Sequence, residues 1–310
     1  MRHPRLARRI AAAFLLTAVV LPAAACSSSK TAKISTGTAD RGSSQKMSDM
    51  GMGDMAGIPT APALAEAAPA GTGLAASYSG YIYLPAAASV SANTPVAFNF
   101  HITGPNDHAV TRYQPYESKL VTFYLVRSDL TGFQELDPTM RQDGTWTVGL
   151  PALPAGSYRT YVTFAAPDSG EGTPLVYSLS ALLSVTGSGA SAVAAPPAPA
   201  SSVTVDGYTL KLSGALKAGT TTELALDVTS GGKPVVYFDR YLDGYAHLTG
   251  FREGDGAFAH LLATGRAGGA GGSGALTTRA LFPESGVWRL FVQFETAGKL
   301  HEAAFTVTVS

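Results

Sequence analysis

The sequence predicts an all-β protein with two β-sandwich domains in tandem, and three observations support this. Gly and Pro contribute 34 and 19 of the 310 residues, which favours turns over helices. Short runs of alternating apolar residues are separated by turn-forming residues at a spacing of roughly 8–12, as is typical of a sandwich. No amphipathic helical pattern of useful length is visible. The runs expected to form strands are Val96–Ile102, Leu120–Arg127, Ser157–Phe164, Thr222–Val228, Tyr245–Arg252, Val287–Phe294 and Ala303–Val309.

Residues 1–25 have the features of an export signal. Four arginines and no acidic residue precede or flank the apolar run Ile10–Leu21, which is too short to span a bilayer but suits a signal peptide. Ala23, Ala24 and Ala25 then precede Cys26, the only cysteine, and this resembles the lipobox of bacterial lipoproteins. The resemblance implies that Cys26 is lipidated and anchors the chain at the extracytoplasmic face of the cell membrane. The alternative is ordinary cleavage before Cys26 and secretion.

The rest of the chain divides into two linkers and two larger segments. Residues 26–72 are rich in Ser, Thr, Gly, Ala and Pro and contain no aromatic residue, so we expect a disordered tether. Residues 187–202 have the composition of a second linker. Residues 73–186 and 203–310 are each long enough to form a core. We therefore expect a β-sandwich in each.

The two larger segments resemble each other in sequence. Leu120–Phe133 aligns without gaps on Tyr245–Phe258 at an offset of 125. Further along, Gly156–Phe164 falls on Gly286–Phe294. In both copies a glycine is followed by an aromatic residue, an arginine and alternating apolar residues. A repeat of this length indicates a duplicated domain rather than a solenoid.

Composition excludes several classes of function. The formal charge is zero and only 14% of residues are charged, so there is no basic stripe for nucleic acid. A single cysteine excludes an intrachain disulfide and a cysteine-based zinc site. No spacing identifies a catalytic triad or nucleophile elbow, so we do not expect an enzyme. The tyrosine-rich stretches 113–124 and 237–245 could instead form a binding face for an envelope protein.

One predicted hairpin in the second segment carries two histidines. A turn at Glu253–Gly256 makes paired positions sum to 509, so Thr249 faces His260 and His247 shares their face. His247 and His260 would then be diagonal neighbours at about 6–8 Å, close enough to share a metal ion. His301 is a candidate third ligand. The alternative is two partly buried histidines with hydrogen-bond partners.

The matching hairpin of the first segment carries carboxylates instead. Thr122, Glu135 and Asp137 occupy the positions that correspond to His247, His260 and Leu262. Carboxylates suit hard cations rather than copper, and only two are present here. We expect Glu135 and Asp137 to lie on a solvated face.

A methionine cluster lies in the predicted tether. Met47, Met50, Met52 and Met55 fall within nine residues, although the whole chain has only six methionines. A disordered segment has no core for them to fill, and thioethers are soft ligands that select Cu(I). These four residues are candidate Cu(I) ligands. The alternative is a linker of biased composition.

Several motifs resemble a family of bacterial exported proteins with Ig-like domains of the kind compared with the copper-resistance protein CopC and with YtkA. The similarity rests on Gly231–Val235, Arg240–Gly244, His247-Leu248, Arg252–Asp255 and His260, with a companion pattern at Val126–Gln134. The resemblance implies two tandem Ig-like sandwiches and metal handling. The family's H-x-H-P motif is replaced here by His260-Leu261-Leu262-Ala263 in the second segment. In the first segment, the same motif is replaced by Glu135-Leu136-Asp137-Pro138.

Two hypotheses for function follow. In the first, the chain is an exported, lipid-anchored envelope protein that binds copper or another metal through Met47–Met55, His247, His260 and His301. In the second, it is a non-catalytic cell-surface interaction module with no metal role. The methionine cluster favours the first hypothesis, and the missing family histidines favour the second.

Overall fold

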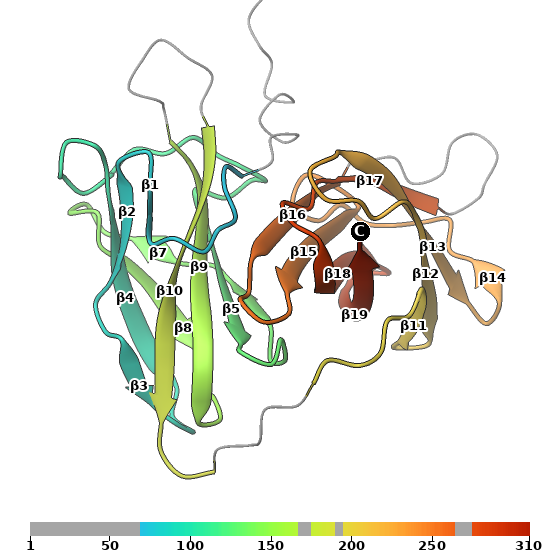
Figure 1. The fold of residues 1–310 in the computed structure, drawn as a ribbon, viewed down its shortest axis with the longest axis horizontal. Helices are drawn as coiled ribbons and strands as arrows, with labels where there is room; N and C mark the ends of the chain where they lie inside the picture. Colours follow the sequence, from blue (N-terminus) through green and yellow to red (C-terminus); the bar gives the residue numbers. More distant parts are fainter. Residues whose placement is uncertain (1–68, 167–174, 190–194, 264–274) are drawn as a thin grey trace, which may run out of the picture. The chain divides into compact units, whose positions relative to one another are not determined.

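The computed structural model describes residues 69–166, 175–189, 195–263 and 275–310, which contain strands, turns and loops but no helix (Figure 1). The prediction of an all-β protein is therefore confirmed for this part of the chain. No membrane-spanning helix is present among these residues. The candidate residues Cys26, Met47, Met50, Met52 and Met55 lie outside the described ranges. All described residues belong to one compact unit that extends from Met55 to Ser310.

The described part of residues 69–189, here called the N-terminal half, forms two five-stranded sheets. Their strand orders are β1-β2-β4-β8-β7 and β3-β10-β9-β5-β6. Aromatic and aliphatic side chains from both sheets, such as Phe100, Trp146, Phe123 and Phe164, share one hydrophobic cluster, so the sheets face each other across a core. The strands are β1 (Ser77–Tyr78), β2 (Tyr81–Pro85), β3 (Ser89–Ser91), β4 (Val96–Thr103), β5 (Val121–Arg127), β6 (Gln134–Leu136), β7 (Thr139–Met140), β8 (Trp146–Leu150), β9 (Gly156–Ala166) and β10 (Leu175–Thr186).

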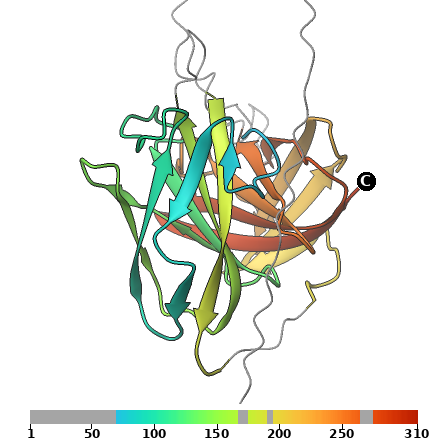
Figure 2. The same cartoon turned by 60° about the vertical axis from the view of Figure 1, so that its left-hand side comes forward.

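The described part of residues 195–310, the C-terminal half, forms one nine-stranded sheet of order β11-β12-β13-β17-β16-β15-β18-β19, with β14 paired to β13. Strand β16 pairs with both β15 and β17, and so joins β15, β18 and β19 to the strands on the other side of it. Strands β18 and β19, in red, curve strongly in Figure 2. The strands are β11 (Ser202–Val205), β12 (Tyr208–Gly214), β13 (Thr222–Ser230), β14 (Lys233–Pro234), β15 (Ala246–Arg252), β16 (Phe258–Ala263), β17 (Ala275–Ala280), β18 (Gly286–Thr296) and β19 (Lys299–Val309).

The seven runs expected from the sequence all coincide with strands, namely β4, β5, β9, β13, β15, β18 and β19. Their ends agree within four residues. The long strand β10 is missing from those expected runs. Its sequence, Leu175–Thr186, contains three serines among its apolar residues, which weakens a period-two pattern.

Strands β5 and β15 are buried on both faces. Phe123 and Leu125 of β5 point into the core of the N-terminal half, whereas Tyr124 and Val126 point away from it. In β15, Leu248 enters the core of the C-terminal half and Phe251 points away. The outward residues meet one another in a third hydrophobic cluster, which therefore joins the halves. Its members are Tyr124, Val126, Leu130, Phe133, Tyr161, Phe251, Phe258 and Phe291.

Candidate functional site

The hairpin β15–β16 places His247 and His260 on the outward face that meets the N-terminal half. Thr249 pairs with His260 and Leu248 with Leu261, so the predicted register is confirmed. The two imidazole ring centroids are 4.9 Å apart, nearer than the spacing expected from the diagonal alone. The side chains are 2% and 0% exposed, respectively. The hairpin thus brings the two rings together inside the protein.

A third side chain, Glu117, enters this space from the N-terminal half. It lies in the tight turn Tyr116–Lys119 before β5, closed by backbone hydrogen bonds between its two end residues. Glu117 and Ser118 have φ angles of 51° and 63°, a conformation that turns of this type require and that non-glycine residues rarely adopt. This strained turn aims the Glu117 carboxylate at the histidines.

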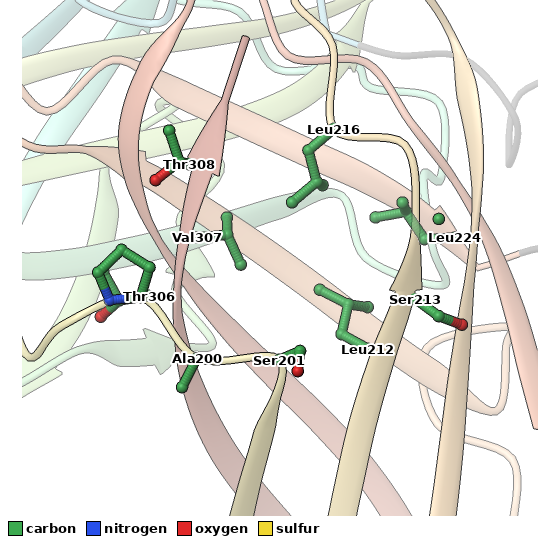
Figure 3. A pocket seen from close by; sticks show the side chains of 11 residues that line it. Ala200, Ser201, Leu212, Ser213, Leu216, Leu224, Thr306, Val307 and Thr308 are labelled. Carbon is green, nitrogen blue, oxygen red and sulfur yellow. The ribbon is translucent and has the colours of Figure 1, made fainter.

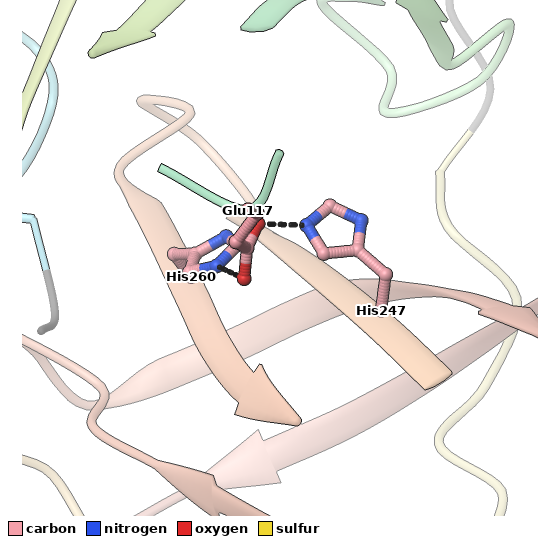
Figure 4. A group of neighbouring side chains, drawn as sticks. All are labelled: Glu117, His247 and His260. Carbon is pink, nitrogen blue, oxygen red and sulfur yellow. Dashed lines mark hydrogen bonds and ion pairs between the residues drawn. The ribbon is translucent and has the colours of Figure 1, made fainter. Parts of the chain in front are cut away.

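The Glu117 carboxylate lies between the two imidazoles (Figure 4). His260 Nε2 is 2.8 Å from Glu117 Oε1, and His247 Nε2 is 3.1 Å from Glu117 Oε2. The second contact has ion-pair distance but not the alignment of a hydrogen bond. One potential ligand atom from each residue lies within 4.8 Å of the others. We call Glu117, His247 and His260 the inter-half cluster.

Two further side chains hold the opposite edge of the His247 ring. His247 Nδ1 is 3.2 Å from Gln293 Oε1 and 3.0 Å from Glu135 Oε2. Glu135 is only 5% exposed, so the expectation of a solvated position is wrong for this residue. Asp137 is 67% exposed and pairs with Lys119, in agreement with that expectation. Glu135 differs because the C-terminal half covers it.

Burial and charge act in opposite directions on the pKa values of the cluster. Burial raises the pKa of Glu117, but His260 and His247 outweigh it and hold that pKa well below the ordinary value. Burial lowers the pKa of His247, yet Glu135 and Glu117 together raise it well above 6.5. Burial and the charge of Glu135 raise the pKa of Glu302, which contacts Gln293, to about 7. The site therefore binds protons tightly at His247.

Several buried polar atoms around the cluster lack an aligned hydrogen-bond partner among the described residues. These are His247 Nε2, His260 Nδ1, Glu135 Oε2 and the hydroxyl of Thr249. Thr249 lies directly opposite His260 in the hairpin. Two of these atoms, His247 Nε2 and Glu135 Oε2, lie at ion-pair distance from a partner. Buried polar atoms are nearly always satisfied in folded proteins, so the other two are candidates for a bound water or ion.

The residues fit a divalent transition-metal ion. Two imidazoles and a carboxylate suit zinc, copper(II), nickel or iron better than the softer Cu(I). With metal–ligand bonds of about 2.0–2.2 Å in tetrahedral geometry, neighbouring donors lie about 3.3–3.6 Å apart, so an ion would move the Glu117 carboxylate slightly away from the histidines that it now contacts at 2.8 and 3.1 Å. Metal-binding histidines also donate their second N–H to a carboxylate or carbonyl, as His247 does to Gln293.

His301 does not belong to the cluster. Its Nδ1 is 2.8 Å from Asp206 Oδ2, and its ring packs between Tyr208 and Phe294. The structure therefore gives this candidate third ligand other partners, and Glu117 takes the position next to the two rings. The tyrosine-rich stretches do not form one exposed face either, because Tyr116 and Tyr124 are buried.

One cavity borders the inter-half cluster, and another lies away from it. One of about 490 Å³ borders the hairpin at Phe258–His260 and is walled by Pro69–Thr72 on another side. A separate cavity of about 280 Å³ is lined by Leu212, Leu216, Leu224 and Val307 between β12 and β19 (Figure 3). The second cavity has no titratable side chain in its lining. The first is the nearer approach to the inter-half cluster.

The two halves contact each other through corresponding residues. At the sequence offset of 125, Ser118 corresponds to Asp243, and these two side chains are hydrogen-bonded to each other. The repeat also makes Phe133 equivalent to Phe258. Phe291 corresponds to Tyr161 in the second aligned block.

Contacts between the halves also come in equivalent pairs. Phe133 stacks on Phe291 at 4.3 Å, and its counterpart Phe258 stacks on Tyr161 at 5.5 Å. The Tyr116 ring lies against His260, and the equivalent Tyr241 hydroxyl lies 3.5 Å from Glu135 Oε1. The halves therefore pack about an approximate two-fold axis, as the subunits of a symmetric dimer do.

Comparison with known proteins gives a family match for the C-terminal half. Residues 203–310 match the family model of a domain of unknown function, DUF8832. Comparison with curated protein sequences gives no match.

Comparison with solved structures finds two bacterial adhesins among its matches. The Escherichia coli adhesin FdeC is 18% identical over 76% of this chain, with a TM-score of 0.25. The Yersinia pseudotuberculosis adhesin InvE is 15% identical over 77%, with a TM-score of 0.22. This chain spans 65% and 61% of their respective lengths. Similarities of this size say nothing about a shared function.

Proposed function

We propose that the protein is a non-catalytic metal-binding protein that holds one divalent transition-metal ion in the inter-half cluster. The observation that carries the proposal is the convergence of Glu117, His247 and His260 from both halves in a fully buried site. Burying a carboxylate and two imidazoles is costly unless each is paired. A shared cation compensates that cost and gives the unaligned His247 Nε2 a role.

The burial of the cluster supports binding rather than catalysis. The three side chains are at most 5% exposed, so a substrate larger than an ion has no direct access. The nitrogen and oxygen donors favour zinc and copper(II), because such sites bind these ions most strongly among the divalent first-row metals.

We propose further that the chain acts at the cell envelope. The arginine-rich start, the apolar run Ile10–Leu21 and the small residues before Cys26 support export with a lipid anchor. Met47, Met50, Met52 and Met55 are a separate proposed Cu(I) site. Changing these four methionines to serine is expected to abolish Cu(I) uptake without affecting the divalent ion, and unchanged Cu(I) uptake would refute this part.

The experiment is a calorimetric titration of residues 27–310 with Zn²⁺ and Cu²⁺ at neutral pH. We expect one equivalent to bind to the wild type. E117Q, H247Q and H260Q should each reduce the affinity by well over tenfold, because each removes a ligand. H301Q is the matched control, since His301 is also buried but bound to Asp206. Equal binding by the wild type and all four variants would place the ion elsewhere.

A specific observation favours a second candidate, an interaction module without metal. His247 already lies against two carboxylates, and an ion has to displace its tightly held proton. In this case the cluster is a buried ion-pair network that fixes the halves of a surface protein. The same titration distinguishes the candidates, because this one predicts no divalent ion bound above a protein blank.

A further inference from the structure

The faces that join the two halves are near-copies of each other. We infer that a second copy of this chain binds by exchanging halves, so that the N-terminal half of each copy packs on the C-terminal half of the other. This inference rests on the packing of the halves and not on the proposed metal. Every contact of the present interface is available in the exchanged dimer.

Shape alone does not decide which halves pair. Phe133 and Phe258 occupy equivalent positions, and each stacks on the aromatic residue at the equivalent position of the other half, Phe291 or Tyr161. Two N-terminal halves could therefore place Phe133 on Tyr161 in the same way. The apolar part of the face is self-complementary.

The polar residues restrict the pairing to unlike halves. In a pair of N-terminal halves, Glu117 would face the Thr122 and Glu135 of the other copy, which buries two carboxylates without a cation. In a pair of C-terminal halves, two Asp243 side chains would meet on the axis. Unpaired buried carboxylates disfavour the first pairing, and repulsion between the two like charges disfavours the second. Only unlike halves bring Glu117 to the histidines and Ser118 to Asp243.

The length of the connection between the halves sets the protein concentration at which the exchanged dimer competes with the closed monomer. Strand β10 ends at Thr186 and β11 begins at Ser202, so 15 residues connect them. A short connection gives the halves of one chain an effective concentration of roughly millimolar. The closed monomer therefore dominates in dilute solution, and exchange becomes favourable as the protein concentration approaches that value.

Disulfide trapping tests the exchange independently of any metal. Cys26 is the only cysteine, so a chain of residues 27–310 has none. One copy carries S118C and a second, size-tagged copy carries D243C. They are mixed at high concentration, incubated and then oxidised. We expect a covalent dimer of the two different copies, because Ser118 and Asp243 are in contact across the interface.

Controls make each outcome decisive. The double variant S118C/D243C is expected to form an intramolecular cross-link when dilute. No covalent dimer in the mixture, or a wild-type mass by light scattering that stays monomeric to millimolar concentration, would overturn the exchange. Covalent dimers of S118C alone, formed as readily as in the mixture, would overturn the charge-based restriction to unlike halves.

Discussion

The two halves share a local architecture but differ in the chemistry of their joining faces. Turns Tyr116–Lys119 and Tyr241–Gly244 are closed by the same pair of backbone hydrogen bonds. The buried aromatic residue of the late strand is anchored alike in both. The Tyr158 hydroxyl donates to the Pro154 carbonyl, and Trp288 Nε1 donates to the Glu284 carbonyl.

The differences concentrate at polar positions. Thr122, Glu135 and Glu117 of the N-terminal half correspond to His247, His260 and Leu242 of the C-terminal half. The apolar contacts of the joining face therefore occur in two equivalent copies, whereas the inter-half cluster occurs in one. Divergence at a few polar positions is sufficient to turn a self-complementary surface into a specific one.

A second difference concerns the sheets. In the C-terminal half, β16 pairs with β15 through Leu261 and then with β17 at Leu262 and Ala263. In the N-terminal half the equivalent segment is split into β6 and β7 around Asp137-Pro138. Proline lacks the N–H that a sheet requires, so the two sheets stay separate there.

The largest expected effect comes from breaking the apolar part of the joining face. F133A removes the ring that stacks on Phe291 at 4.3 Å and should destabilise the protein by about 3–5 kcal/mol, as buried Phe→Ala changes do. Urea unfolding measures the change. L182A is the control at an exposed position and should stay within about 0.5 kcal/mol. An equally small change for F133A would mean that this contact does not stabilise the fold.

The inter-half cluster should give the metal-free protein a stability maximum between about pH 4.5 and 6.5. The pKa of Glu117 is depressed, so its contribution is lost as the pH falls below the ordinary value of 4.5. The pKa of His247 is raised, so its contribution is complete below 6.5 and is lost as the pH rises above it. Urea midpoints across pH in the presence of a chelator measure both limbs.

Variants assign each limb of this profile to the cluster. E117Q should flatten the acid limb, because it removes the depressed carboxyl group. L182A should leave the shape of the profile unchanged, since the exposed Leu182 side chain does not titrate and lies outside the cluster. An E117Q profile with the wild-type acid limb would assign that limb to other carboxyl groups.

A smaller effect should follow from loosening the support of His247. Q293L removes the acceptor of the Nδ1 proton, and such changes typically weaken metal affinity about 10–100-fold. Zinc titration measures it. T147V alters a hydrogen bond to Asn99 within β4 and β8 and should leave the affinity unchanged. Wild-type affinity in Q293L would show that Gln293 does not orient the ring.

The smallest effect should come from the sheet difference. P138A restores a backbone N–H but adds freedom to the unfolded chain, so we expect a loss of stability of about 0.4–1 kcal/mol. Urea unfolding of P138A checks this value. A gain in stability would contradict this expectation. It would indicate that Pro138 destabilises the N-terminal half by interrupting a strand that is otherwise favourable.

Local sequence patterns predicted the fold class and the hairpin but not the whole cluster. The period-two alternation and the turn at Glu253–Gly256 were sufficient to place His247 and His260 on one face in the correct register. Glu117 gave no such signal, because it lies in a turn and its counterpart in the repeat is Leu242. Its positive φ is visible only in the structure.

Glu135 and His301 show the limit of local patterns. Their strand positions were predictable, but their surroundings depend on what packs over them. Glu135 is covered by the other half, and His301 meets Asp206 from a turn 95 residues earlier. One signal for the joining face was available: Tyr124 and Val126 alternate with core residues on β5, so that strand is apolar on both faces.

The most direct test of the proposed function is a crystal structure of the zinc-loaded protein with anomalous difference maps recorded at the zinc edge. We expect one strong peak within about 2.0–2.2 Å of the Nε2 atoms of His247 and His260 and of a carboxylate oxygen of Glu117. A map without a peak there, with Glu117 still hydrogen-bonded to His260, would contradict it and leave the cluster as an ion-pair network between the halves.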